Sequence, residues 1–427
     1  MVTKKDRYSG YFSKYETMTA SERRQFQNKK LRQIVAYAYE KAPAIRKKLE
    51  RAKVKPADLK TVKDLEKLAI TEKADLVGMQ KKNPPFGGFN GVPPEELRRL
   101  FVSPGPIYEP GEMVYDDPRW AQGLYAGGFR AGDICQITFN FHMVPFAFML
   151  DSSLTMLGCR TIPTGVGNTE LQVQILKDLK VTGFLGTPSF LFAAVQKAKE
   201  MGFNPKKDLA LKVAFVAAEM LPESLRDSLE AEAGLIIRQS YGTADIGCLG
   251  FECIEKNGMH FPDDCIVEIV DPRTGRQLGP GEVGEVVGTC FNKVYPLIRF
   301  GSGDLSYTSD EPCPCGRTSP RLIKIVGRVD QVTKVKGMFI HPGLVDLVVQ
   351  KFPEICACQV LVTREGHQDR MTLRAELSKI CPDPKRLAEE VKKALQEILR
   401  IRGEVQFLPK GSLPKGVKKI EDKRVWE

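Results

Sequence analysis

The chain has 427 residues, more than one ordinary hydrophobic core holds, so we expect two or more domains. Hydrophobic residues make up 42%, no run reaches the ~20 apolar residues of a membrane span, and the N-terminus lacks an apolar signal segment. We therefore expect a cytoplasmic protein without a membrane partner. The net charge of +11 suits a polyanionic small ligand, but no aromatic-interleaved basic motif points to nucleic acid.

The first hundred residues have the pattern of helices. Thr19 and Glu22 form a capping-box pair, and helical spacing of apolar residues then continues until Pro43. Thr61 with Asp64 resembles a second helix start. Proline and glycine pairs mark a loop, and a strand ending at Val102 follows it.

Short apolar strands alternate with helical stretches between residues 134 and 237. This alternation predicts an α/β fold whose large N-terminal domain holds doubly wound parallel sheets. Ligands of such sheets bind at the carboxyl ends of the strands. Two loops are expected there, Ala218-Glu219 after VAFVA and the stretch from Ser240 to Asp245 after LIIRQ.

The pattern changes twice after Asp263. Alternating strands with DPRTG and GPGEVG turns predict a small antiparallel barrel within the first domain. After Asp330, a strand, a helix from Pro342, two strands, a helix from Pro384 and a last strand near Val405 predict a small C-terminal α+β domain. We therefore expect domains 1–329 and 330–427, with Asp330 at their joint. Asp304 follows two glycines, and a carboxylate so placed suits a pair of sugar hydroxyls.

Eleven cysteines in a cytosolic chain favour packing residues or metal ligands over disulfides. Cys253, His260, Cys313 and Cys315 lie in turn-rich sequence, and three thiolates with one imidazole make the closed tetrahedral set of a structural zinc. Reduced thiols beside a lone turn histidine are the alternative. Cys248 is a substitute ligand.

Taken together, these segments resemble the phenylacetate-CoA ligase branch of the adenylate-forming superfamily over nearly the whole chain. The matching segments are ITEKADL, IPTGVGNTELQ, GTPSF, VAAE, SYGTAD, YPLIRFGSGDL, CPCGRT, GRVDQ and KGMFIHPGLVD. The resemblance implies an active site between a large and a small domain. It also implies a ligase that joins a carboxylic acid to AMP from ATP and then passes the acyl group to coenzyme A, with rotation of the small domain between the two steps.

The resemblance assigns roles residue by residue. Ala218 and Glu219 match the adenine-contacting loop, and Tyr241, Gly242 and Thr243 match the loop beside the AMP phosphate. Asp245 stands where the family has a glutamate that binds Mg²⁺. Further matches are the ribose aspartate Asp304, its neighbour Arg328, the hinge Asp330, the coenzyme A tunnel glycine Gly337, and the zinc positions Cys253, His260, Cys313 and Cys315.

Two segments depart from the family pattern. The loop that wraps the ATP phosphates and ends in Lys-Pro aligns with residues 103–110, where prolines remove N–H donors and Glu109 replaces the lysine. At the C-terminus the Gly-Lys turn of the catalytic lysine is shortened. Lys418 is favoured for that role over Lys415 and Lys419, and an ordinary basic tail is the alternative.

The segment FNFHMVPFAFM, which contains His142, borders the carboxylate substrate in the family, although a packed core helix explains it equally well. Three functions stay open at this point: an ATP-dependent acid-CoA ligase for an aromatic acid, a related transferase that does not cleave ATP, and a non-catalytic homologue that binds a nucleotide or acyl-CoA. The sequence also leaves a homodimer open.

Overall fold

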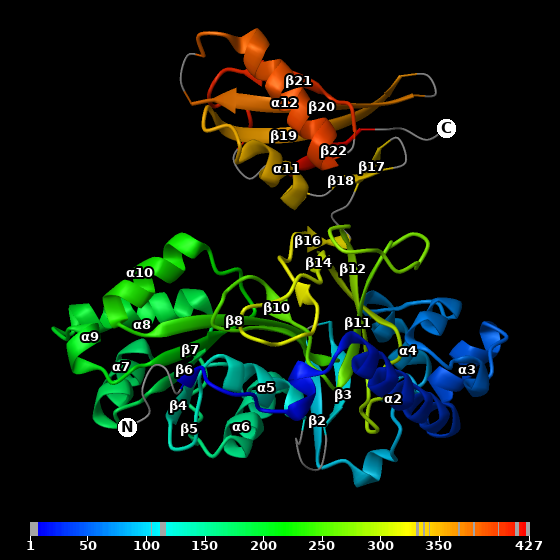
Figure 1. Ribbon diagram of the computed structural model, residues 1–427. Coiled ribbons are helices and arrows are strands. Elements are labelled where there is room, and N and C mark those ends of the chain that lie inside the picture. The colour runs from blue at the N-terminus through cyan, green and yellow to red at the C-terminus, as the bar shows by residue number, and fades with distance from the viewer. Residues whose placement is uncertain are drawn as a thin grey trace. The chain divides into compact units, whose positions relative to one another are not determined.

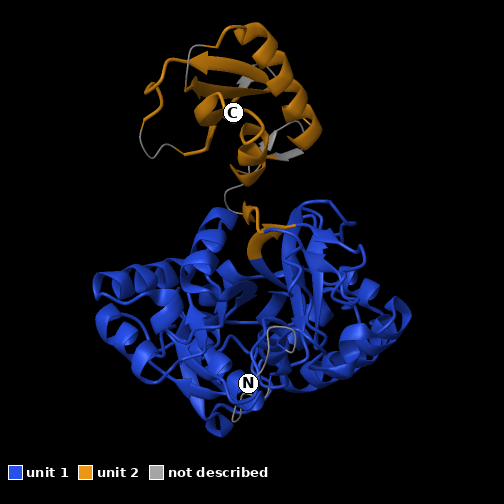
Figure 2. Ribbon diagram, turned by 60° about the vertical axis from the view of Figure 1, so that its left-hand side comes forward, with its two compact units in different colours: residues 1–302, 307–324 blue, residues 303–306, 325–427 orange. Residues whose placement is uncertain are grey.

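The structure is a computed structural model that describes residues 7–103, 105–111, 117–329, 333–335, 338–340, 342–365, 368–378, 381–399, 401–414 and 418–423. The chain divides into two compact units (Figure 2). Unit 1 comprises residues 1–302 and 307–324, and unit 2 comprises residues 303–306 and 325–427. Asp330, the expected joint, lies outside the described residues, so the boundary at 329/330 stays a prediction.

The N-terminal part of unit 1 is helical, as the sequence predicts. Thr19 caps α2 (Ala20–Lys41): its hydroxyl accepts from the N–H of Glu22, whose carboxylate accepts from the N–H of Thr19 in return. The second start, at Thr61, opens a short 3₁₀ helix rather than an α-helix. The elements are η1 (Lys14–Thr17), α2, α3 (Pro43–Arg51), η2 (Pro56–Asp58), η3 (Val62–Lys67), η4 (Lys73–Asp75), α4 (Leu76–Lys82) and η5 (Pro94–Glu96).

A mixed nine-stranded sheet has the order β14-β15-β10-β9-β8-β7-β6-β4-β5. Strands β5, β4, β6, β7 and β8 are parallel, and β9, β10, β15 and β14 continue the sheet by antiparallel pairing. The strands are β4 (Ile134–Ile137), β5 (Arg160–Ile162), β6 (Gly183–Gly186), β7 (Val213–Val216), β8 (Ile236–Thr243), β9 (Gly247–Glu252), β10 (Met259–His260), β14 (Thr308–Ser309) and β15 (Arg321–Leu322).

The parallel strands separate two hydrophobic cores. Val213 and Phe215 of β7 face one core, while Ala214 and Val216 face the other, because successive side chains of a strand point to opposite faces. Figure 1 shows α5 and α6 on one side of these strands and α8 and α10 on the other. The helices are α5 (Pro118–Ala126), α6 (Phe146–Met156), α7 (Thr169–Asp178), α8 (Pro188–Glu200), α9 (Pro205–Asp208) and α10 (Glu223–Ala233). The prediction of a doubly wound α/β fold is confirmed.

The strands expected to form a small barrel lie in a separate sheet of order β1-β13-β12-β11, in which β16 also pairs with β13. Strands β11 and β12 are antiparallel, whereas β1 joins β13 in parallel. The bounds are β1 (Thr71–Glu72), β11 (Cys265–Val270), β12 (Gly284–Cys290), β13 (Phe300–Ser306) and β16 (Gly327–Arg328). Through β1, the ITEKADL segment is anchored beside the strand that carries Asp304.

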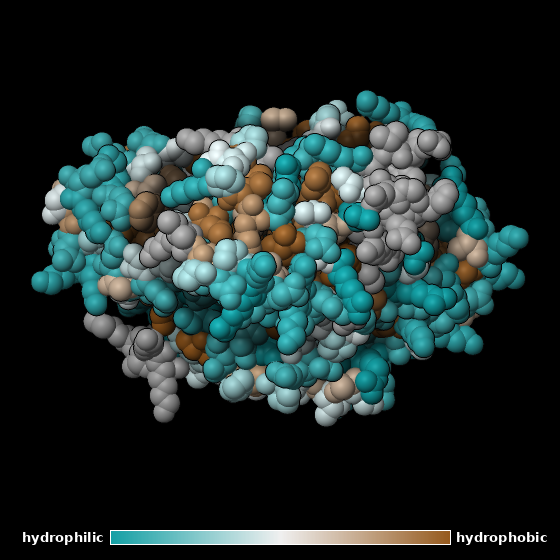
Figure 3. Space-filling view, turned by 90° about the horizontal axis from the view of Figure 1, so that it is seen from above, coloured by the Kyte–Doolittle hydropathy of each residue, from teal (hydrophilic) through white to brown (hydrophobic). Residues whose placement is uncertain are grey.

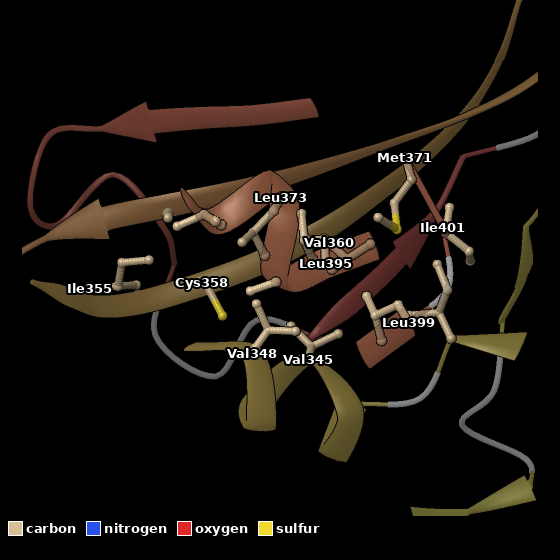
Figure 4. Packing of buried hydrophobic residues seen from close by; sticks show 14 of the residues in the cluster. Val345, Val348, Ile355, Cys358, Val360, Met371, Leu373, Leu395, Leu399 and Ile401 are labelled. Atoms are coloured by element: carbon tan, nitrogen blue, oxygen red, sulfur yellow. The ribbon is translucent and has the colours of Figure 1, made fainter. Parts of the chain in front are cut away.

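Unit 2 holds a four-stranded sheet of order β21-β20-β19-β22 with two helices packed on it. Figure 4 shows the core, in which Val345 and Val348 from α11 meet Leu395 and Leu399 from α12 over the sheet residues Val360 and Leu373. The elements are β17 (Thr333–Val335), β18 (Met338–Ile340), α11 (Pro342–Val349), β19 (Ile355–Glu365), β20 (Gln368–Leu377), α12 (Pro384–Leu399), β21 (Glu404–Leu408) and β22 (Ile420–Asp422). The predicted α+β composition is confirmed.

The surface carries both polar and apolar groups. On the face drawn in Figure 3, hydrophilic residues cover most of the surface and hydrophobic residues gather in smaller groups between them. Within the described part of the chain, no helix combines the length and the apolar character that crossing a bilayer requires.

Candidate active site

The loops after β6 and β7 meet at the carboxyl edge of the parallel strands. Glu219 follows β7 and accepts hydrogen bonds from the hydroxyl and the N–H of Ser189, at 2.9 and 3.2 Å, at the start of α8. Ala218 has a φ of +70°, a conformation that costs free energy for any residue with a Cβ and that is frequent at functional sites. Both residues are exposed, as contact with a ligand requires.

The end of β8 carries the predicted phosphate-contacting loop. A bulge between Tyr241 and Gly242 changes the register with β9. A Cβ at Gly242 would lie 2.4 Å from the carbonyl oxygen of Gly247 and 2.9 Å from Cζ2 of Trp120, so only glycine fits here. The Thr243 hydroxyl accepts from the N–H of Ile246 at 3.2 Å, which fixes the turn that leads into Asp245.

Asp245 is buried at the end of this loop, and its partner comes from the distant ITEKADL segment. Lys73 Nζ donates to Asp245 Oδ2 at 2.6 Å. Asp245 Oδ1 is buried with no hydrogen-bond partner in the described part of the chain. The ion pair therefore fixes one carboxylate oxygen and leaves the second for another ligand.

The altered phosphate loop forms a hairpin of β2 (Arg99–Ser103) and β3 (Ile107–Gly111). Glu109 pairs with Phe101 on the buried face, while Tyr108 is exposed on the other. The side chain of Gln80, in α4, binds the backbone N–H and C=O of Tyr108 at 2.9 and 2.8 Å. Because Lys73 and Gln80 lie in one short segment, that segment positions both the hairpin and Asp245.

Glu109 is 3% exposed, and both of its carboxylate oxygens lack a hydrogen-bond partner among the described residues. Burial, with the negative charge of Asp245 as the next contribution, raises the pKa of Glu109 to about 8. The hydroxyls of Tyr295 and Ser103 are likewise buried and unpartnered within the described ranges. Burial and then the charges of Asp245 and Glu109 raise the pKa of Tyr295, which places all three groups near one another.

The predicted ribose aspartate lies in unit 2. Asp304 in β13 is the register partner of Arg328 in β16, and Arg328 Nη1 donates to Asp304 Oδ1 at 3.1 Å. Gly303 has a φ of +76°, and a Cβ there would lie 2.8 Å from Arg328 Nη2. The positive φ before the aspartate favours glycine at this position.

The two described lysines of the C-terminal segment have different surroundings. Lys419 Nζ contacts Asp346 Oδ1 at 2.7 Å. Burial lowers the pKa of Lys419, but this hydrogen bond together with the charges of Cys358 and Asp346 outweighs burial, so the net shift is upward. The side chain of Lys418 is exposed, while its carbonyl accepts from Gln359 at 3.2 Å. Asp330, Gly337 and Lys415 lie outside the described residues.

The four predicted zinc ligands come together in unit 1. The ligand atoms of Cys253, His260, Cys313 and Cys315 all lie within 4.8 Å of one another. The sulfurs of Cys253 and Cys313 are 3.7 Å apart, and Cys315 Sγ is 3.5 Å from His260 Nε2. The substitute ligand Cys248 is not in this group and lies within hydrogen-bonding distance of the carbonyl of Gly250.

These spacings fit one tetrahedral zinc ion. In a tetrahedral site, two thiolate sulfurs that each lie about 2.3 Å from the zinc are about 3.8 Å from each other. A thiolate sulfur and an imidazole nitrogen bound to the same zinc are about 3.6 Å apart. Ser319 Oγ lies 3.3 Å from His260 Nδ1 and would orient the ring, as partners of zinc-bound histidines do. A hydrogen bond with Cys253 lowers the pKa of Cys315, which favours the thiolate that a metal needs.

The aromatic segment after β4 is partly core and partly loop. Phe146 begins α6 and contacts Phe139 edge-on and Trp120 at a tilt, at ring-centroid distances of 4.6 and 5.0 Å. Trp120 also lies against Gly242, so the cluster borders the phosphate-contacting loop. His142 is exposed.

Sequence reasoning missed the side chains that support Asp245 and the hairpin. Lys73 lies in the quoted ITEKADL segment, which was a usable signal, but Gln80, Tyr295 and Trp120 were given no role. Their partners lie far away in sequence, 172 residues in the case of Lys73 and Asp245. Ser189, the partner of Glu219, lies in the quoted GTPSF segment.

Comparison with known proteins covers both units. A family model described as AMP-binding enzyme matches residues 129–289, and one described as AMP-binding enzyme C-terminal domain matches residues 337–427. A phenylacetate-coenzyme A ligase of Thermus thermophilus is 32% identical over 86% of this chain and 84% of its own length, and one of Pseudomonas putida is 29% identical over 96% of each. An open conformation of 2-hydroxyisobutyryl-CoA ligase in complex with 2-HIB-AMP and CoA matches with a TM-score of 0.86 at 26% identity, over 96% of this chain and 93% of that chain.

Proposed function

Because the chain belongs to the phenylacetate-CoA ligase family, we propose that it activates an aromatic carboxylic acid as its acyl-adenylate and transfers the acyl group to coenzyme A. The coarser activity, that of an AMP-forming acid-CoA ligase using ATP and coenzyme A, follows from the family. A role limited to binding, without catalysis, is not favoured. The observation that carries the proposal is 32% identity over most of the chain to a phenylacetate-coenzyme A ligase.

The aromatic substrate is supported by the surroundings of the phosphate-contacting loop. Trp120, Phe139 and Phe146 form an aromatic wall of edge-on and tilted rings that reaches Gly242. Aromatic rings favour offset or edge contacts with one another, and such a wall suits a planar apolar acid. A small aliphatic hydroxy acid, the substrate class named for the structural relative, is the competing substrate.

The chain's own residues have separate roles in this proposal. Tyr241, Gly242 and Thr243 would contact the AMP phosphate, with Glu219 and Ala218 at the adenine and Asp304 with Arg328 at the ribose. Lys418 would provide the ammonium that stabilises the negative charge developing during adenylation. The hinge at Asp330 and the tunnel glycine Gly337 complete the set.

Two metal ions fit the residues present. The group Cys253, His260, Cys313 and Cys315 would hold a structural zinc, since four protein ligands leave no position for a reacting water. The buried, unpartnered Oδ1 of Asp245 fits Mg²⁺, which binds proteins through one or two carboxylates together with substrate phosphates. When bound with ATP, Mg²⁺ would neutralise charge on the phosphates.

A panel of acids tests the substrate assignment. Purified protein is mixed with ATP, Mg²⁺, coenzyme A and either phenylacetate, benzoate, 2-hydroxyisobutyrate or acetate, and the thioester products are measured by mass spectrometry. The proposal predicts that an aromatic acid gives the highest kcat/KM. A higher value for 2-hydroxyisobutyrate would overturn the aromatic assignment and leave the ligase activity intact.

A further inference from the structure

Glu109 is almost completely buried, and among the described residues it forms no ion pair with a lysine or arginine. Its two oxygens, Asp245 Oδ1 and the hydroxyls of Tyr295 and Ser103 are buried atoms without hydrogen-bond partners in the described part of the chain. The charge of Asp245 raises the pKa of both Glu109 and Tyr295, so these groups lie near one another. Such atoms are costly unless something binds them, because water no longer solvates them. The group therefore lacks a ligand that carries positive charge or donates hydrogen bonds.

Position and orientation of the two carboxylates are fixed independently. The hairpin pairing puts Glu109 on the same buried face as Phe101, and Gln80 fixes the backbone of the neighbouring residue. The ion pair with Lys73 occupies Asp245 Oδ2 and leaves Oδ1. Once Glu109 gives up its proton, two carboxylates with one ammonium carry a net charge of −1, which a bound cation stabilises.

We propose that Glu109 and Asp245 together bind the divalent cation that accompanies ATP, so that a metal ion held by Glu109 replaces the lysine that relatives carry at this hairpin position. The inference rests on the proposed function for the role of the metal, but its binding site stands on these residues alone. Glu109, Asp245 and Lys73 together with a divalent cation carry a net charge of +1, so positive charge next to the phosphates is kept.

The ligand chemistry fits this assignment. Mg²⁺ and Mn²⁺ prefer carboxylate oxygens, and Mg²⁺ keeps several waters while one or two carboxylates bind it. The hydroxyls of Tyr295 and Ser103 would hydrogen-bond to the carboxylates or to the bound waters. Lys73 is a positioning residue here, since it fixes Asp245 without contacting the metal.

Manganese binding to the nucleotide-free protein tests the site. Chelator-treated holoprotein, with its zinc content checked, is titrated with Mn²⁺, and free Mn²⁺ is measured by electron paramagnetic resonance. We expect Glu109→Gln and Asp245→Asn each to weaken one Mn²⁺ site by at least about tenfold. Glu40→Gln, which changes an exposed glutamate in α2, should bind Mn²⁺ as the wild type does.

The outcomes separate this inference from the proposed function. Unchanged Mn²⁺ binding in a folded Glu109→Gln variant, with binding lost in Asp245→Asn, would show that Asp245 acts alone and would overturn the inference even if the ligase is active. Loss of binding in both variants supports the inference even if no acid is activated. Glu109→Lys is a second variant: if it folds, it should lose the Mn²⁺ site in the absence of ATP, and retention of the site would contradict the assignment.

Discussion

Glu252 and Glu109 are both buried glutamates of unit 1, with exposures of 1% and 3%, yet their surroundings are opposite. Both oxygens of Glu252 accept hydrogen bonds from Arg226, at 2.8 and 2.9 Å, and from Gln239, at 2.9 and 2.8 Å. Neither oxygen of Glu109 has a partner within the described residues. One carboxylate belongs to a completed structural network and the other lacks its ligand.

The difference between Glu252 and Glu109 distinguishes a buried carboxylate that stabilises the fold from one that we assign to ligand binding. Removing one member of a complete buried pair leaves the other charge unpaired, whereas removing an unpaired charge relieves a cost that already exists. In the proposed zinc site the four ligands would likewise surround one position and leave nothing open, as the partners of Glu252 do. The four predictions below test this division between closed and open sites.

The largest effect is expected at the cysteine group. The double change Cys313→Ser and Cys315→Ser should reduce bound zinc from about one per chain to none. It should also abolish the cooperative thermal unfolding transition or strongly lower its midpoint temperature, because structural zinc contributes folding free energy. Elemental analysis and calorimetry measure both effects. Cys356→Ser, at an exposed cysteine, is the control and should retain zinc. Wild-type protein that is stable and free of zinc would reject the site.

The complete pair should respond next most strongly. Glu252→Ala should lower the free energy of unfolding by about 3–5 kcal/mol, since buried Arg226 would lose its buried counter-charge and keep only the exposed Glu223. Denaturant unfolding measures this loss. Glu223→Ala is a matched control, because Glu223 contacts the same arginine at 3.1 Å but is 63% exposed, and it should cost less than about 1 kcal/mol. Equal losses for the two variants would contradict the role given to burial.

The same contrast applies to the C-terminal lysines. Lys418→Ala should lower the rate of adenylate formation about 10²–10³-fold, the cost of removing one group that stabilises transition-state charge. Lys419→Ala removes an ion pair with Asp346 and should change that rate only slightly. The measurement is single-turnover formation of acyl-AMP. A large loss for Lys419→Ala with normal stability would transfer the catalytic role to that residue.

The smallest effect is the pH dependence caused by Glu109. Its pKa of about 8 in the folded chain lies above the usual pKa of 4.5. At pH values between 4.5 and 8, the native state therefore binds more protons than the unfolded state. Stability in the presence of a chelator should therefore fall as the pH rises from about 5 to about 8, by an amount on the order of 2–4 kcal/mol. Glu109→Gln should remove this slope. The same slope in the variant would show that other groups cause it.

The sequence was sufficient for features that repeat or cluster locally. Alternation of short apolar strands with helices predicted the doubly wound sheet, and the two cores on its faces explain why, since strands buried on both sides have no polar face. The cysteine group was also found, because its residue types are rare and specific. Residue alternation in the hairpin, with Phe101, Ile107 and Glu109 on one face, was a further signal that Glu109 is buried.

Contacts between distant segments could not be predicted. No local pattern says that Lys73 pairs with Asp245, or that Gln80 binds the hairpin backbone, because both contacts depend on how the parts of unit 1 pack. From sequence alone, Glu109 is only a departure from the pattern of the phosphate loop. Glu109 is buried near Asp245, and Asp245 Oδ1 has no hydrogen-bond partner among the described residues. Glu109 can therefore also be interpreted as a metal ligand.

Product stoichiometry tests the central claim most directly. With the preferred acid, ATP, Mg²⁺ and coenzyme A, the protein should release AMP and pyrophosphate in amounts equal to the thioester formed, and acyl-AMP should accumulate when coenzyme A is withheld. Chromatography with mass spectrometry quantifies all four species. Thioester formation without AMP, or nucleotide binding without pyrophosphate release for any acid, would contradict the assignment of this chain as an AMP-forming ligase.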